Sequence, residues 1–388
     1  MKKSLIALAA LAATASFAQS SVVIDGYIDR AYTSTNNTDN TKDAKAIGSS
    51  AGTTTIGFKI REDLGGGMSV GASINTDWAD LGGATQANAV ANAQGSGFAN
   101  SQSFIDLTGK FGVVRLGSPN NFTLTNAISV ASPAFSTGVG SAYSSAFSIA
   151  NGLGTGTVGF IGTVGKQADI TNTANVGARA IRISNTIQYS SPSFNGLSVH
   201  LGYTPKNNNV TANSGAGNTV GVTEAAVRYT NGPLDAMFTT IKYDIGSNGV
   251  RQTSIAGATP PAVTTTALTV QDNTQNLLGA SYAVMSNLKL HAGYGTFSSS
   301  GNNFKGSSQS VGVTYTMGAV DILAQVAQVN DKSTTNVDRK MMGLGANYNL
   351  SKTARLYARY DNINYGDNVA AAAGSKQNRY ALGLSKSF

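Results

Sequence analysis

The chain has 388 residues, of which 12% are charged, and a formal net charge of +8. It has no cysteine and only two histidines, which excludes disulfides, cysteine-ligated metal centres and cysteine nucleophiles. Glycine is abundant, with 45 residues, and aspartate outnumbers glutamate by 17 to 2. This composition is poor in helix formers and rich in strand and turn residues, so we expect an all-β protein.

The first 18 residues have the pattern of a secretory signal peptide. Lys2 and Lys3 precede an apolar run, and Ser16-Phe17-Ala18 places small residues at the two positions that a signal peptidase reads. We therefore expect residues 1–18 to be removed and residues 19–388 to form a single domain. After residue 18 there is no apolar run of about 18 residues, so the mature chain is either secreted or crosses a membrane as strands.

Apolar and polar side chains alternate along many segments of the mature chain. Ile56, Phe58 and Ile60 alternate with glycine and basic residues, and residues 197–203 repeat this pattern. Soluble sandwiches and membrane barrels both have such strands, so the alternation alone leaves both open. Tyrosines with the parity of the apolar face favour the barrel, because aromatic girdles mark its membrane interfaces. They are Tyr189, Tyr203, Tyr229, Tyr282, Tyr294, Tyr315, Tyr348 and Tyr360.

Seven short connections separate the alternating segments, and glycine, asparagine and proline supply the turn geometry in most of them. If each connection joins two strands on the same side, and the first and last strands pair, the count is 16 strands. The predicted fold is an all-β, 16-stranded antiparallel transmembrane β-barrel with short periplasmic turns and long extracellular loops. The turns are Glu62–Gly67, Gly109–Gly112, Pro192–Gly196, Asn231–Pro233, Val284–Asn287, Met317–Ala319 and Asn349–Lys352.

The longest connection covers residues 118–180. It is rich in glycine, serine, alanine and threonine, and it is longer than a compact domain normally leaves without regular structure. We therefore expect it to be either disordered or functional. Its charged residues are Lys166, Asp169 and Arg179, so it contributes little negative charge.

The last segment alternates apolar Tyr380, Leu382 and Leu384 with small or polar residues and ends in Phe388. A final strand with a terminal aromatic residue resembles the assembly signal of outer-membrane barrels. A last lipid-facing strand would also be apolar on one face. Both interpretations can hold together.

Six segments of the chain contain motifs that are weak one by one. Their order, together with the signal peptide and the terminal Phe388, is specific. They are Ser20–Tyr32, Thr55–Ser73, Ser103–Ser118, Arg182–Tyr203, Val227–Ala236 and Leu350–Asn362. In this order they resemble the trimeric general-diffusion porins of Gram-negative bacteria, especially the β-proteobacterial branch. The resemblance implies a homotrimeric, water-filled channel in the outer membrane for passive diffusion of ions and small hydrophilic solutes.

The resemblance also implies that residues 118–180 fold into the lumen and narrow it. Enteric relatives carry an acidic Pro-Glu-Phe-Gly element there, and the nearest match is Pro133-Ala134-Phe135-Ser136, which has no carboxylate. We assign Pro133, Phe135, Lys166, Asp169 and Arg179 to this constriction loop. Other expected partners are outer-membrane lipid, lipopolysaccharide and the barrel-assembly machinery, whereas nucleic acid, cofactors and metals are not expected.

Alternation assigns a set of charged side chains to the inward face. Basic side chains on a narrow channel wall focus their field on passing ions, so a positive wall opposite a loop with little negative charge predicts a modest anion preference. Inward aspartates oppose this preference if they reach the same height. The basic residues are Lys59, Arg115 and Arg182, and the aspartates are Asp25, Asp29 and Asp106. Glu224 and Arg228, on one face of one strand, are expected to pair.

Two other functions remain open at this point. A barrel with a plugged lumen would be an adhesin or surface antigen. A barrel hydrolase would need His200 or His291 beside a serine, with a third group orienting the ring, but no spacing supports this. We therefore assign no catalytic residue and expect no enzymatic activity.

Overall fold

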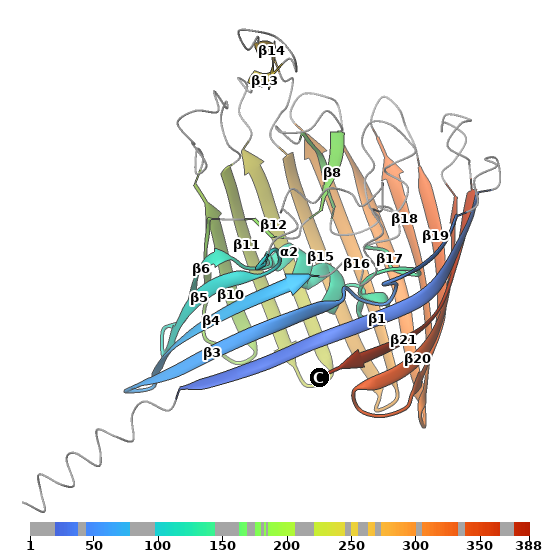
Figure 1. Ribbon diagram of the computed structural model, residues 1–388, viewed down its shortest axis with the longest axis horizontal. Helices are drawn as coiled ribbons and strands as arrows, with labels where there is room; N and C mark the ends of the chain where they lie inside the picture. Colours follow the sequence, from blue (N-terminus) through green and yellow to red (C-terminus); the bar gives the residue numbers. More distant parts are fainter. Residues whose placement is uncertain are drawn as a thin grey trace, which may run out of the picture.

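The computed structural model describes residues 20–37, 44–77, 98–143, 163–168, 175–179, 182–183, 185–205, 221–244, 250–254, 263–267, 273–299, 305–332, 338–364 and 376–388. The predicted signal peptide, residues 1–18, lies outside these ranges. Sixteen antiparallel strands form a closed ring (Figure 1), which confirms the predicted fold class. None of the helices in the described ranges is long and apolar enough to cross a membrane.

The ring runs in chain order and closes where the last strand pairs with the first. Its first half consists of β1 (Ser21–Asn37), β3 (Thr55–Gly65), β4 (Met68–Asp77), β5 (Ser103–Gly109), β6 (Gly112–Ser118), β9 (Thr186–Ser190), β10 (Leu197–Thr204) and β11 (Gly221–Asn231). Its second half consists of β12 (Leu234–Asp244), β15 (Asn273–Met285), β16 (Leu288–Ser299), β17 (Lys305–Met317), β18 (Val320–Asp331), β19 (Arg339–Asn349), β20 (Ala354–Asn364) and β21 (Lys376–Ser387).

Three further pairings lie beside this ring. The short strand β2 (Ala44–Gly48) pairs with the second half of β1. Two hairpins, β7 (Thr163–Ala168) with β8 (Asn175–Arg179) and β13 (Val250–Ser254) with β14 (Val263–Ala267), form separate two-stranded sheets. In Figure 1 the β13–β14 hairpin stands beyond the strand ends, on the side opposite the C-terminus.

All seven predicted connections join consecutive strands of the ring. Glycines with positive φ occur in several of them, such as Gly67 at +77° and Gly318 at +59°, because these turns need backbone conformations that other residues rarely adopt. All seven lie on one side of the ring, at the bottom of Figure 1. We call this the turn side.

The outer face of the ring is apolar and exposed. Along β10, Leu197, Val199, Leu201 and Tyr203 are all exposed, while the alternate residues point inward. A barrel whose apolar side chains face outward can be covered only by an apolar medium, which is the arrangement of a membrane barrel. Of the eight tyrosines predicted for the aromatic girdle, five are exposed and three are half-buried. The exposed ones are Tyr203, Tyr282, Tyr294, Tyr315 and Tyr348, and the half-buried ones are Tyr189, Tyr229 and Tyr360.

Candidate functional site

A folded segment lies inside the ring. Residues 119–143, here called the lumen loop, contain α2 (Phe122–Thr125), the π-helix η1 (Asn126–Val130) and the 3₁₀-helix η2 (Pro133–Phe135). The segments α2 and η1 contact β11, β12, β15 and β16, and η2 contacts β17 and β18. Figure 1 shows α2 within the barrel. Within the described residues, the lumen loop therefore lies against the inner wall from β11 to β18, whereas its helical segments make no comparable contact with β3 to β6.

Local sequence explains how the lumen loop starts. Asn121 caps α2 with extended backbone (φ −72°, ψ 162°), and its side-chain oxygen accepts a hydrogen bond of 2.8 Å from Leu124 N. Asparagine is among the preferred residues for this position. Pro133 occupies the first turn of η2, where its missing N–H costs nothing.

Glu224 on β11 anchors the start of the lumen loop. Its buried carboxylate accepts hydrogen bonds from Phe122 N (2.9 Å), Thr123 N (2.6 Å) and the Thr123 hydroxyl (2.6 Å). These two N–H groups belong to the first turn of a helix and have no partner within the helix. The expected pair between Glu224 and Arg228 is wrong: Arg228 forms a two-pronged contact with Asp235, at 2.9 and 2.7 Å.

The middle of the lumen loop binds wall carbonyls directly. Asn126 Nδ2 donates to Met237 O and Leu277 O, both at 2.9 Å. The wall residue opposite is Gly279, where a Cβ would lie 2.1 Å from Asn126 Oδ1. Further along, a Cβ on Gly343 would lie 2.5 Å from the Gly140 carbonyl oxygen. Glycine at these wall positions lets the loop backbone approach closely.

Buried polar side chains of the wall hold the rest of the lumen loop. The Ser132 hydroxyl is 2.9 Å from Gln325 Oε1, which also accepts a bond of 3.2 Å from Ala142 N. His291 Nδ1 is 3.2 Å from the Ala131 carbonyl oxygen. Glutamine and histidine on the inner face are therefore loop anchors in this half of the ring.

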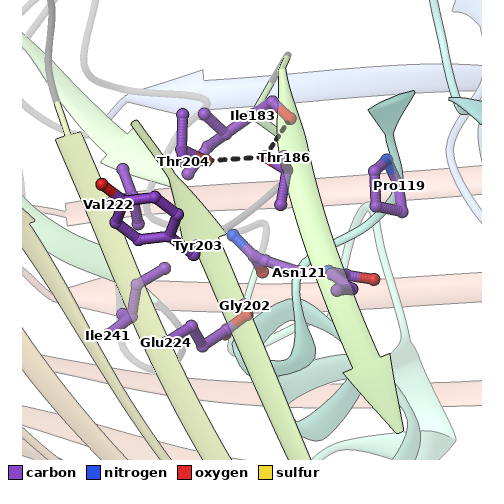
Figure 2. Close-up of a pocket in the computed structure, with 11 residues that line it drawn as sticks. Pro119, Asn121, Ile183, Thr186, Gly202, Tyr203, Thr204, Val222, Glu224 and Ile241 are labelled. Atoms are coloured by element: carbon purple, nitrogen blue, oxygen red, sulfur yellow. Dashed lines mark hydrogen bonds between the residues drawn. The ribbon is translucent and has the colours of Figure 1, made fainter. Parts of the chain in front are cut away.

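A small cavity lies under the root of the lumen loop (Figure 2). It encloses about 10 Å³, the size of one water molecule. Asn121 Nδ2 and Gln188 Oε1 come from two of its lining residues, and both are buried without a hydrogen-bond partner within the described part of the chain. The Gln188 amide nitrogen donates 2.9 Å to the Asn120 carbonyl oxygen.

The wall formed by β1 and β3 to β6 carries four of the charged residues predicted to line the pore. Lys59 on β3 contacts Asp25 on β1, and Arg115 Nε on β6 lies 3.9 Å from Asp106 Oδ2 on β5. The Arg115 guanidinium also lies over the Phe104 ring, 4.9 Å from its centroid. Lys59 and Arg115 keep much of their side-chain surface exposed.

Arg182 lies at the loop end of this wall. Its Nη2 is 3.0 Å from Asp77 Oδ2, and its Nη1 is 3.4 Å from Asn120 Oδ1. The structure therefore brings Asp25 and Asp106 to the same heights as their basic neighbours. This meets the condition under which these two aspartates oppose the predicted anion preference, and Arg182 also has an aspartate, Asp77, beside it.

Asp29 differs from its predicted position on the open lumen wall. Its side chain is fully buried, because residues 49–54 leave the wall between β2 and β3 and turn inward over it. Ser50, Ala51 and Gly52 all donate their backbone N–H groups to Asp29 Oδ2. Strand alternation gave the correct face but could not predict this cover.

The predicted constriction-loop residues have separate locations. Phe135 is buried at the end of η2, and the Arg359 guanidinium lies 5.3 Å from its ring centroid. Lys166 belongs to β7, which contacts β15 and β16, and Arg179 ends β8. Asp169 lies outside the described residues.

The predicted assembly signal lies on the outer face. Tyr380, Leu382, Leu384 and Phe388 are all exposed. Phe388 is the last residue and also pairs with the first strand, as its backbone exchanges hydrogen bonds with that of Gly26.

Among the described residues, neither histidine has an acidic partner at its ring. His200 Nδ1 is 2.9 Å from Ser190 Oγ, and its Nε2 is 3.0 Å from Ser198 Oγ. Since both ring nitrogens contact serines, neither is left for an orienting carboxylate. His291 is buried under the lumen loop at Ala131. Neither arrangement matches the triad that a hydrolase needs.

Comparison with known proteins gives consistent matches. The model of the Gram-negative porin family matches residues 5–368. Outer membrane porin protein 32 of Delftia acidovorans is 31% identical over 375 residues, covering 92% of this chain and 88% of that protein. An outer membrane porin protein of Bordetella pertussis is 27% identical over 241 residues, covering 55% of this chain and 61% of that protein.

Solved structures share the fold over nearly the whole chain. The anion-selective porin from Comamonas acidovorans superposes with a TM-score of 0.69 at 24% identity, covering 95% of this chain and all of that one (100%). OmpF of Salmonella typhi has a TM-score of 0.58 at 15% identity, with coverages of 95% and 97%.

Proposed function

The chain belongs to the Gram-negative porin family, and we propose that in the outer membrane it forms a channel for passive diffusion of ions and small hydrophilic solutes. The observation that carries this is the division of the inner wall. One half is covered by the lumen loop, and the other presents exposed charged side chains such as Lys59 and Arg115. A lumen lined by exposed charges is suited to water and ions.

We infer a modest preference for anions from the exposed charges. Lys59 is 56% exposed against 37% for its partner Asp25, and Arg115 is 38% exposed against 15% for Asp106. The lumen loop has no charged residue between Pro119 and Tyr143, so it adds no field of its own. The neighbouring aspartates limit the effect. The Comamonas acidovorans structure of the same fold is named an anion-selective porin, which supports the same direction.

We also propose a homotrimer with residues 1–18 as a cleaved signal peptide and residues 118–180 as the constriction loop. An OmpT structure of Vibrio cholerae with this fold is described as a trimer form, which supports the assembly. Lipopolysaccharide and outer-membrane lipid would contact the outer face, and the barrel-assembly machinery would insert the chain. Channel proteins of this family need no enzymatic chemistry, and we propose none here.

Planar-bilayer recording of the refolded protein tests the channel function. A channel gives stepwise increases of current at constant voltage. An occluded adhesin barrel gives no steps, and this result would reject the channel. Ester hydrolysis lost on His200→Ala or His291→Ala would instead favour the hydrolase.

A further inference from the structure

The barrel wall is interrupted beside β1. Ser21–Tyr27 of β1 pair with β3, and Ala31–Thr35 pair with β2. Between these two ladders, residues 49–54 connect β2 to β3 and turn into the lumen. We call this segment the inward turn. The other edge of β1 pairs continuously with β21 from Tyr27 to Asn37, so closure of the ring does not depend on the inward turn.

Asp29 holds the inward turn in place. Its Oδ2 accepts hydrogen bonds from Ser50 N (2.6 Å), Ala51 N (2.7 Å) and Gly52 N (3.1 Å). Its Oδ1 accepts a bond of 2.6 Å from the Tyr357 hydroxyl on β20. A buried carboxylate is stable only when its oxygens are well supplied with donors, and these four donors meet that need.

The inward turn also contacts the tip of the lumen loop, residues Phe135–Gly140. The Thr137 hydroxyl donates 3.2 Å to the Ala51 carbonyl oxygen. Gly138 has a φ of +80°, and a Cβ there would lie 1.4 Å from the Ser50 carbonyl oxygen. Only glycine fits between the tip and the turn.

A second contact path leads from Tyr357 to the same tip. The buried Arg359 guanidinium lies 5.2 Å from the Tyr357 ring centroid and 5.3 Å from that of Phe135. Its Nη2 donates 2.7 Å to Asn347 Oδ1. Arginine between two aromatic faces is held by cation–π attraction. Tyr357 thus supports both the inward turn, through its hydroxyl, and Phe135, through its ring.

The tip is also tied down just after Gly138. Gly140 N donates 2.7 Å to Asp361 Oδ2 on β20. Asp361 forms a two-pronged pair with Arg379 on β21, at 2.9 and 2.5 Å. These contacts of the tip come from strands near the closure of the ring, far along the wall from the Glu224 anchor at the loop root.

We propose that Asp29 and Tyr357 are positioning residues for the channel: through the inward turn they set how far the tip of the lumen loop, Phe135–Gly140, projects into the lumen. We call this set of contacts the clamp. It determines the free cross-section of the channel beside the tip and how far that cross-section stays constant under voltage. The inference rests on the proposed channel function. Asp29 and Tyr357 act on the solute only through the loop, since both are buried.

Single-channel recording of Gly138→Ala against Gly67→Ala is the first test. Both glycines have nearly the same positive φ, +80° and +77°, but a Cβ at Gly67 meets nothing within 4 Å. Backbone strain is therefore matched, and only Gly138→Ala drives a methyl group into the inward turn. We expect altered conductance, closure at lower voltage and a changed polymer size limit for Gly138→Ala, and wild-type values for Gly67→Ala.

The second test uses milder variants in the same recordings. Tyr357→Phe removes the hydroxyl that bonds to Asp29 and keeps the ring against Arg359. Asp29→Asn keeps one oxygen for the inward turn, while Asp29→Ala keeps none. We expect several-fold more frequent closures for Tyr357→Phe and Asp29→Ala, with Asp29→Asn between them and the wild type. Tyr348→Phe, on the outer face, is the control.

Two results would overturn the clamp. One is wild-type conductance, closing voltage and polymer limit in both Gly138→Ala and Tyr357→Phe. The other is a lower heat stability of the folded band on gels for these variants with no change in any channel property, which would make the contacts structural only. A wild-type protein that never conducts would instead reject the proposed function itself.

Discussion

The backbones of Gly26 and Phe388 exchange two hydrogen bonds, each 3.1 Å between nitrogen and oxygen. The Phe388 ring lies over the glycine, since a Cβ on Gly26 would come within 2.4 Å of its Cζ atom. The last residue of the chain therefore closes the turn side of the ring on the first strand. Open strand edges are not tolerated in lipid, so this short contact matters for insertion.

Deleting Phe388 should lower the amount of assembled barrel in the outer membrane several-fold, because both hydrogen bonds to Gly26 are lost together with the ring. Phe388→Tyr keeps the backbone bonds and the aromatic ring, and should assemble like the wild type. Surface protein measured by protease accessibility and by the heat-modifiable band on gels checks both variants. Equal surface levels for the deletion and the wild type would contradict the prediction.

Removing the Glu224 carboxylate should loosen the root of the lumen loop. In Glu224→Ala the N–H groups of Phe122 and Thr123 lose their acceptor, and an unsatisfied buried donor costs about 1–3 kcal/mol. We expect noisier single-channel current and a lower unfolding temperature. Glu224→Gln keeps one oxygen, so its current noise and unfolding temperature should lie between those of the wild type and Glu224→Ala. Glu62→Gln, at the other glutamate of the chain, should leave the current unchanged. Quiet current in Glu224→Ala would refute the anchor.

The ion preference should depend on the two exposed pairs of the open wall. Lys59→Gln leaves Asp25 without its cation, so the reversal potential in a salt gradient should shift in the direction of greater cation selectivity. Asp25→Asn should shift it the opposite way. Arg115→Ala should act like Lys59→Gln, whereas Arg182→Ala should have a smaller effect because Arg182 is mostly buried against Asp77.

The size of these shifts should fall with salt, because the screening length falls from ~10 Å at 0.1 M to ~3 Å at 1 M. Measurements at both concentrations separate a field effect from a change of pore size, which salt does not screen. A cation-selective wild type, or a Lys59→Gln channel identical to it at low salt, would remove these charges from the mechanism.

Gly279 and Asn126 should be energetically coupled. Gly279→Ala places a methyl group 2.1 Å from Asn126 Oδ1 and 3.1 Å from Ala131 Cβ, so it should destabilise the folded protein. Asn126→Ala also destabilises it by removing the hydrogen bonds to the wall carbonyls of Met237 and Leu277 and to the Thr239 hydroxyl, but it creates room for the methyl group. The double variant should therefore be more stable than the two single effects predict when added. Thermal unfolding of the four proteins checks this, and strict additivity would contradict the contact.

The ring of strands was predictable because its signals are local. Alternation such as Ile56, Phe58 and Ile60 fixes a face residue by residue, and turn residues mark where each strand ends. The same rule assigns Asp25, Lys59 and Arg115 to the inward face. A closed antiparallel ring in chain order then follows without any long-range information.

The contacts of the site were less predictable because they join distant parts of the chain. Glu224 and Arg228 share one strand face, yet Glu224 bonds to residues about a hundred positions earlier and Arg228 to Asp235 across a turn. Asp29 has the right parity but is covered by the inward turn, which has no periodicity of its own. The only sequence signals for these anchors were polar residues, such as Gln325 and His291, at inward positions of the strands.

The glycines of the wall under the lumen loop have a consequence for exchanging parts between channels. Surface loops of barrels can usually be replaced freely, since few wall residues depend on them. Here the loop depends on wall strands that are distant in sequence. The absence of a side chain at Gly279 and Gly343 makes room for Asn126 and Gly140 of the loop. In a chimera that receives only residues 119–143, the loop would meet larger side chains at the positions of Gly279 and Gly343 and would be displaced. Transferring this pore to another barrel therefore requires the loop together with the wall glycines against which it packs.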